Sequence, residues 1–194
     1  MVSQSASSIG PIGVEAALLA ASDPTFQPRP TLQKEFELTG RVAIVSGGNR
    51  GLGLEMAEAM CEAGAIVYCL DLPSTPGDEW KATASYVQRL GIEKARLEYV
   101  SVDVTNQQMI WNAAENIANK EGRMDVCIAA AGILHGADCL EYPAEDFQKV
   151  MSVNVNGVLH TAQAAGRQMA KFGTPGSIIL IASMSGSITN KVRL

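Results

Sequence analysis

The sequence predicts an α/β protein with a doubly wound parallel sheet. From residue 38 onward, short apolar runs alternate with segments whose apolar residues recur at helical spacing. The runs are apolar throughout, which is typical of parallel strands buried on both faces. Short connections between such strand–helix–strand units favour right-handed crossovers within one sheet. The 194 residues suit one such domain, and we find no internal repeat and no second domain.

The first half of the pattern holds three strands and two helices. Residues 41–46 form an apolar run that ends in a glycine-rich turn. The helix predicted over residues 51–63 ends at Gly64, because glycine is the residue that most often terminates a helix. A second strand is predicted over residues 65–70, a helix over residues 78–90 before Gly91, and a third strand over residues 97–102.

The second half repeats the alternation. A helix over residues 106–120 is closed by Gly122, and a fourth strand over residues 125–131 is followed by Gly132. Residues 144–172 form a long helical stretch with a predicted break near Asn154. A fifth strand is predicted over residues 177–182.

The first 37 residues differ from the rest and predict a flexible tail with one or two helical turns. They are rich in Ser, Ala and Pro, and Arg29 is the only arginine among them. Neither a signal peptide nor a mitochondrial presequence fits this composition, although a weak import role stays open.

Composition and charge exclude several classes of protein. The net charge of −5 does not favour nucleic acid or anionic membranes, and no apolar stretch is as long as a membrane span. The four cysteines form no C-x-x-C pair, which favours reduced core thiols in a cytoplasmic protein over a disulfide or metal set. His135 and His160 have no ligand pattern, so no metal site is predicted.

A glycine-rich turn between the first strand and helix is the first chemical signal. Gly47, Gly51 and Gly53 follow a G-x-x-x-G-x-G spacing. Glycines let a diphosphate approach backbone amides, and the helix N-terminus supplies free N–H groups and a positive dipole end. A purely structural turn is the alternative.

Acidic and small residues at later strand ends strengthen this signal. Asp71 follows the second strand and could accept hydrogen bonds from an adenosine ribose, which favours NAD over NADP. Arg50 is the counter-argument, because it could bind a 2′-phosphate. Asp103 and Val104 follow the third strand, and small residues fill positions 129–132. Taken singly, solvated carboxylates and tight helix–sheet packing explain these features equally well.

Together, these motifs resemble the short-chain dehydrogenase/reductase family over residues 38–190, with a Rossmann-type sheet. Ser46 stands where that family has Thr, and residues 129–132 lack the two asparagines of its N-N-A-G run. The resemblance implies catalytic roles for Asn154 and Ser183, with Ser185 as the fallback serine. It implies cofactor contacts for Ser46, Gly47, Asn49, Arg50, Gly51, Leu52, Gly53, Asp71, Leu72, Asp103, Val104, Ala130, Ala131 and Gly132.

The family's catalytic Tyr-x-x-x-Lys is not found in the 194 residues. Tyr68, Tyr86, Tyr99 and Tyr142 are not followed four positions later by lysine. We expect that the chain is truncated before this motif and that residues 38–194 form a partial dinucleotide-binding domain. Its sheet should be incomplete at the C-terminal edge, and the chain alone should be poorly soluble with little activity. The full-length form is expected to be a homo-oligomer.

The function implied by the resemblance is hydride transfer between NAD(P) and a secondary alcohol or ketone. The amino-acid sequence around the motifs resembles that of fungal polyol dehydrogenases, so a polyol or ketose is the expected substrate. The alternative is a non-catalytic dinucleotide-binding fragment that lacks the acid/base Tyr and Lys. A nucleotide-sugar epimerase or dehydratase fits less well, because those proteins more often have a G-x-x-G-x-x-G loop.

Overall fold

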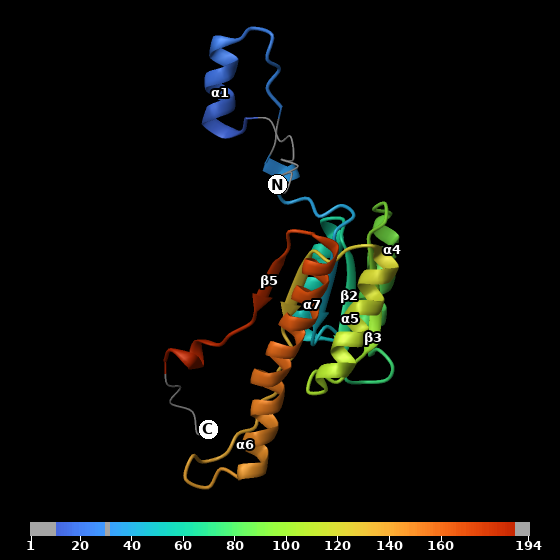
Figure 1. The fold of residues 1–194 in the computed structure, drawn as a ribbon, viewed down its shortest axis with the longest axis vertical. Helices are drawn as coiled ribbons and strands as arrows, with labels where there is room; N and C mark the ends of the chain where they lie inside the picture. Colours follow the sequence, from blue (N-terminus) through green and yellow to red (C-terminus); the bar gives the residue numbers. More distant parts are fainter. Residues whose placement is uncertain (1–10, 30–31, 189–194) are drawn as a thin grey trace. The chain divides into compact units, whose positions relative to one another are not determined.

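A five-stranded parallel sheet forms the centre of the unit that begins at Leu38 in the computed structural model, which describes residues 11–29 and 32–188 (Figure 1). The strand order is β3-β2-β1-β4-β5, and every neighbouring pair is parallel. The strands are β1 (Val42–Ser46), β2 (Ile66–Asp71), β3 (Arg96–Ser101), β4 (Val126–Ala129) and β5 (Ser177–Leu180). The helices of this unit are α3 (Gly51–Glu62), α4 (Asp78–Leu90), α5 (Gln107–Glu121), α6 (Ala144–Met151) and α7 (Val158–Phe172). This order confirms the predicted doubly wound α/β fold.

Helices cover both faces of the sheet, and each face has its own core. On one face, Val42 and Ile44 of β1 pack in a cluster with buried residues of α5 and α7. On the other face, Ala43 and Val45 pack with buried residues of α3 and α4. Every residue of β1 is buried, because its side chains alternate between two apolar layers.

The long helical stretch does not break near Asn154. A π-helical segment, Ser152–Gly157, joins α6 to α7, and the residues at both of its ends keep right-handed helical dihedral angles. The wider π turn therefore takes the place of the predicted break. Gly157 lies against the residues after β3, since a Cβ there would come within 2.7 Å of Val104 Cγ2.

The fourth and fifth strands end two residues earlier than predicted. One further ladder hydrogen bond follows each strand, from the Ala130 N–H to the Ser46 carbonyl at 3.2 Å and from the Ile181 N–H to the Ala129 carbonyl at 3.1 Å. β5 is the outer strand next to β4, and its four residues are exposed.

The segment Met1–Glu37 forms a compact unit separate from Leu38–Leu194. It contains α1 (Gly13–Ser22), which has no buried residue, and the short helix α2 (Leu32–Glu35). The predicted flexibility of this segment stays a prediction.

Three of the four cysteines are buried thiols. Burial raises the pKa of Cys61, Cys69 and Cys127 to about 12. Cys139 is exposed in the loop after β4, so the expectation that all four are core residues is wrong for this one. In residues 11–29 and 32–188, no helix has the length and hydropathy of a membrane span. The same residues contain no group of three His, Cys, Asp or Glu side chains arranged to bind a metal.

Candidate functional site

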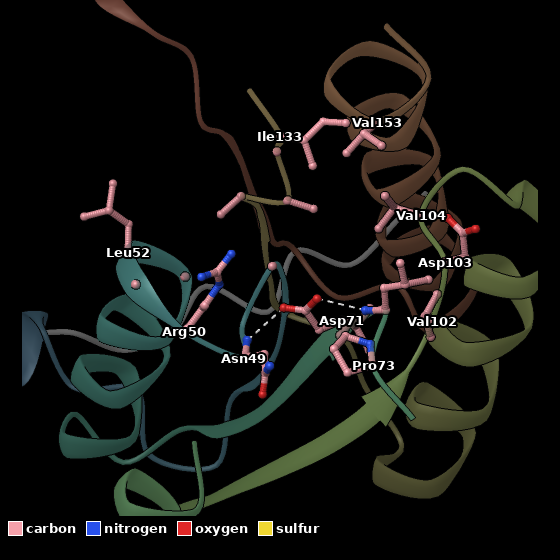
Figure 2. A pocket seen from close by; sticks show the side chains of 18 of the residues that line it. Asn49, Arg50, Leu52, Asp71, Pro73, Val102, Asp103, Val104, Ile133 and Val153 are labelled. Atoms are coloured by element: carbon pink, nitrogen blue, oxygen red, sulfur yellow. Dashed lines mark hydrogen bonds between the residues drawn. The ribbon is translucent and has the colours of Figure 1, made fainter. Parts of the chain in front are cut away.

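A cleft of about 700 Å³ opens at the carboxyl ends of the central strands (Figure 2). Parallel strands bring their carboxyl ends to one edge of a sheet, and this edge is where α/β proteins bind ligands. The lining consists of Gly47, residues 49–53, 70–73, 102–104 and 130–133, and the side chains of Glu79 and Val153. Every residue predicted to contact a cofactor, except Ser46, lines this one cleft.

The glycine-rich turn needs glycine for two different reasons. A Cβ on Gly47, whose φ is +71°, would lie 2.8 Å from Ala131 Cα, and one on Gly53 would collide with the Gly47 carbonyl oxygen. Gly51 has a φ of +56°, but a Cβ there would meet no described heavy atom within 4 Å. Two glycines therefore allow close packing, and the third faces open space at the start of α3.

The N-terminus of α3 is suited to an anion. Arg50 precedes the helix and makes no side-chain capping bond in the part of the chain that the structure describes. No acidic residue lies in the first turn. The first N–H groups of a helix have no partner within it, and the helix dipole favours negative charge there. A diphosphate fits this end of the cleft.

Asp71 ends β2 with each carboxylate oxygen held by a backbone amide. The Asn49 N–H donates to Oδ2 at 3.0 Å and the Leu72 N–H donates to Oδ1 at 2.8 Å (dashed lines in Figure 2). An ionised carboxylate has about four acceptor positions, so each oxygen can accept a second hydrogen bond. The carboxylate is thus fixed in orientation and can still bind a pair of hydroxyl groups.

Three further charged side chains lie along this cleft, those of Arg50, Glu79 and Asp103. Arg50 lies on the glycine-rich side of the cleft. Glu79 reaches the cleft from the first turn of α4. The sequence carries no signal for Glu79, because only the packing of α4 brings it to the cleft. Val153 reaches the cleft from the π-helical segment, which periodicity did not predict. Ile133 directly follows the predicted residue Gly132, so its place after the fourth strand was an available signal; both residues are labelled at the cleft in Figure 2.

Ser46 lies beneath the cleft wall. Its side chain is buried, and its Oγ accepts a hydrogen bond from the Ala131 N–H at 3.3 Å. The serine therefore braces the residues after β4 against the end of β1. Its expected contact with a cofactor stays a prediction.

The Asp103 carboxylate accepts hydrogen bonds from within its own loop. The N–H and the hydroxyl of Thr105 both donate to Asp103 Oδ1, at 2.9 and 2.7 Å. This turn follows β3 and presents Asp103 and Val104 to the cleft.

Asn154 lies in the π-helical segment and binds one backbone residue through both ends of its amide. Oδ1 accepts from the Ile133 N–H at 2.9 Å, and Nδ2 donates to the Ile133 carbonyl at 2.8 Å. Asn154 does not line the cleft itself. It fixes the backbone of Ile133, which does line the cleft.

Ser183 follows β5 and is also outside the lining of the cleft. It is exposed, and its Oγ accepts from the Ser185 N–H at 3.2 Å at the start of the short 3₁₀ turn Met184–Gly186. The catalytic roles of Asn154 and Ser183 stay predictions.

Comparison with known proteins identifies the family. The short chain dehydrogenase family model matches residues 41–193. The chain is 32% identical over 166 residues to the short chain dehydrogenases/reductase notP′ of Aspergillus versicolor, covering 84% of this chain and 56% of that protein. It is 34% identical to sorbose reductase sou1 of Schizosaccharomyces pombe, covering 80% of this chain and 59% of the relative. It is 35% identical to the probable NADP-dependent mannitol dehydrogenase of Yarrowia lipolytica, covering 82% and 55%.

Solved structures agree with the fold. A short-chain type dehydrogenase/reductase from Mycobacterium marinum matches with a TM-score of 0.77 and 33% identity, covering 85% of this chain and 64% of that one. NAD⁺-bound xylitol dehydrogenase matches with a TM-score of 0.69 and 26% identity, covering 79% and 56%. The chain belongs to the short-chain dehydrogenase family. It spans 55–59% of the length of the three curated relatives above.

Proposed function

We propose that the protein is an oxidoreductase that transfers a hydride between a nicotinamide dinucleotide and a secondary alcohol or ketone. The observation that carries this proposal is the cleft itself. It combines an uncapped helix N-terminus in a glycine cradle with the fixed carboxylate of Asp71. The first feature suits a diphosphate and the second suits ribose hydroxyls. Membership of the short-chain dehydrogenase family supports the same chemistry.

NAD is the proposed cofactor in preference to NADP. Asp71 and Glu79 are two of the three carboxylates along the cleft, Asp103 being the third, and their negative charge would repel a 2′-phosphate. Arg50 opposes this preference, since its charge could bind that phosphate. The relatives also differ in their cofactor. The mannitol dehydrogenase is named NADP-dependent, and the xylitol dehydrogenase structure is NAD⁺-bound.

When bound, the nicotinamide ring supplies the hydride chemistry. We assign Ser183 the role of orienting the substrate oxygen by a hydrogen bond from its hydroxyl. Asn154 positions Ile133 at the cleft and, as in the family, would hold a water in a proton relay. The sequence contains no tyrosine followed four residues later by lysine. A non-catalytic dinucleotide-binding chain is therefore the second candidate function.

A polyol or the matching ketose is the proposed substrate. Support comes from sorbose reductase and mannitol dehydrogenase among the relatives. D-arabinitol 2-dehydrogenase is the activity that we would test first, because the amino-acid sequence around the motifs resembles that of fungal polyol dehydrogenases.

We also propose that the intact protein is a cytoplasmic homo-oligomer. Three buried, unpaired thiols suit a reducing compartment. Phe147, Met151, Val155 and Leu159 recur every four residues from α6 to α7 and are all more than a third exposed. An apolar row of this kind is typical of a surface that packs against another subunit. Light scattering of the full gene product would test the oligomer.

The experiment that tests the function has two steps. First, calorimetric titration of the 194-residue chain with NAD and with NADP measures binding. Second, NAD reduction in the presence of D-arabinitol, sorbitol and mannitol is followed for this chain and for the longest product of its gene. Activity in either protein supports the oxidoreductase. Binding without activity in both favours the second candidate function, and no binding contradicts both.

A further inference from the structure

The loop between β2 and α4 is anchored near its start by two hydroxyl groups of β3. The Ser101 hydroxyl donates to the Leu72 carbonyl at 3.3 Å, and the Tyr99 hydroxyl donates to the Pro73 carbonyl at 2.8 Å. Leu72 and Pro73 line the cleft, so this anchor fixes part of its wall.

The far end of the same loop is held by the glycine-rich turn. Gly77, the residue before α4, donates its N–H to Asn49 Oδ1 at 2.8 Å. The backbone N–H of Asn49 donates to Asp71 Oδ2 at 3.0 Å. Asn49 thus binds both ends of the connection from β2 to α4, across 22 and 28 positions of sequence.

An amide side chain suits this position electrostatically. Asn49 lies in the turn that leads to the uncapped N-terminus of α3, where phosphate groups would bind. Its carbonyl oxygen accepts the Gly77 N–H without adding a negative charge there. A carboxylate could accept the same hydrogen bond but would repel the phosphates.

Fixing this loop in advance has a consequence for binding. Residues 72–77 lead directly into the first turn of α4, which carries Glu79 to the cleft. When the wall of a site is ordered in only a fraction of the molecules, the affinity for the ligand is reduced to that fraction of its intrinsic value. A loop already held against the glycine-rich turn removes that cost.

We propose that Asn49 is a positioning residue that holds residues 72–77 against the glycine-rich turn, so that the site for the adenosine ribose is preformed. This inference rests on the proposed dinucleotide binding. The hydrogen bond between Gly77 and Asn49 affects ligand affinity only through the position of residues 72–77.

Two substitutions remove the same hydrogen bond from opposite sides. Asn49→Ala removes the acceptor. Gly77→Pro removes the donor, and its Cδ, which takes the place of the amide hydrogen, also displaces the Asn49 amide; the φ of −72° at this position is one that proline adopts. Gly77→Ala is the matched control, because it keeps the N–H and its Cβ would lie at an ordinary 3.6 Å from the Asn49 side chain. Asn112→Ala controls for loss of an exposed asparagine on α5.

The measurement is the dissociation constant of ADP-ribose for each form of the 194-residue chain. We expect binding to weaken by about three- to tenfold in Asn49→Ala and in Gly77→Pro, the range for one net hydrogen bond. The double variant should lose no more than either single variant, because both remove one interaction. Gly77→Ala and Asn112→Ala should bind like the unaltered chain.

Hydrogen exchange of the Gly77 amide gives an independent readout. Exchange should become faster in Asn49→Ala, because the Gly77 N–H loses its acceptor. Asn49→Asp should restore the slow exchange, since it keeps an acceptor. Unchanged ADP-ribose affinity in Asn49→Ala, or additive losses in the double variant, would overturn the inference. If the unaltered chain binds neither ADP-ribose nor NAD, the proposed function fails, and the inference fails with it.

Discussion

The Asp71 carboxylate accepts hydrogen bonds from the backbone amides of Asn49 and Leu72 and can still accept ribose hydroxyls. Asp71→Asn keeps the size of the side chain but removes its charge. We expect NAD to bind about tenfold more weakly, because hydrogen bonds to a charged acceptor contribute about 1.5–3 kcal/mol. NADP should lose less, since the repulsion of its 2′-phosphate falls as well.

The quantity to measure is the ratio of the NADP and NAD dissociation constants. Asp78→Asn is the matched control, because Asp78 begins the neighbouring helix but does not line the cleft. An unchanged ratio in Asp71→Asn would show that another group sets the cofactor preference.

Asp125 is a buried carboxylate that joins three strands at the opposite ends from the cleft. Its side chain accepts from the Val42 N–H at 2.8 Å and from the Arg123 guanidinium at 2.6 and 2.7 Å. Its own N–H donates to the Val42 carbonyl, and its carbonyl accepts from the Ser177 N–H. Burial by itself would raise the pKa of Asp125, but these hydrogen bonds and the charges of Arg123 and Arg41 lower it below its usual value.

This lowered pKa gives a pH-dependent stability. A carboxyl group whose pKa is lower in the folded protein stabilises the fold above its unfolded pKa of about 3.9, and this contribution is lost as the pH falls through the folded value. We expect Asp125→Asn to cost about 2 kcal/mol at pH 7, as for a lost charged hydrogen bond. The difference from the unaltered chain should shrink below about pH 4.

Urea unfolding at pH 7, 5 and 3 measures this difference, and Asp78→Asn serves again as the control. A difference that stays constant from pH 7 to pH 3 would contradict the assignment.

At the scale of elements, the junction between β1 and α3 depends on glycines with different roles. Gly53→Ala places a methyl group against the Gly47 carbonyl oxygen, so α3 must shift relative to the turn. We expect this overpacking to cost about 1–3 kcal/mol and to abolish measurable NAD binding. Gly51→Ala meets open space and should cost about 1 kcal/mol from its positive φ alone.

Chemical denaturation and NAD titration of both variants test this distinction. Equal losses of stability and binding in the two variants would show that close packing at Gly53 is unimportant.

The π-helical segment shows how one element serves the cleft. Within the segment, Val153 lines the cleft and Asn154 binds the backbone of Ile133. Periodicity predicted one long helix with a break near Asn154, whereas the helix continues through these residues as a π turn. An α-helix and a π-helix differ by one residue in a turn, and tertiary contacts such as that of Gly157 with Val104 decide between them.

For the whole molecule, the exposed outer strand is the main risk to solubility. Ile178, Ile179 and Leu180 of β5 are 41–53% exposed, and β4 is the strand that pairs with β5 among the described residues. An apolar outer strand can pair with a second chain. We expect Ile179→Lys to reduce self-association several-fold without lowering the melting temperature, because charge on an edge opposes pairing.

Size-exclusion chromatography with light scattering over a range of concentrations measures this effect. Leu18→Lys adds the same charge to α1, in the separate N-terminal unit, and is the control. An equal reduction of self-association by both variants would show that net charge, and not the exposed strand β5, controls it.

The amino-acid sequence was enough to predict the succession of strands and helices along the chain and the edge of the sheet that carries the cleft. Apolar periodicity and glycine stops are local properties, so they predict local structure. Strand ends that carry Gly47, Asp71 and Asp103 must meet once the strands are parallel, so thirteen of the fourteen predicted cofactor residues line one cleft.

Tertiary packing selects the other residues that join them at the cleft. Ser46 is turned into the interior as a brace, while Glu79 and Val153 reach the cleft from helices. The hydrogen bond between Asn49 and Gly77 joins residues 28 positions apart. Such contacts depend on how helices pack on the sheet, and no local pattern of the chain encodes that geometry.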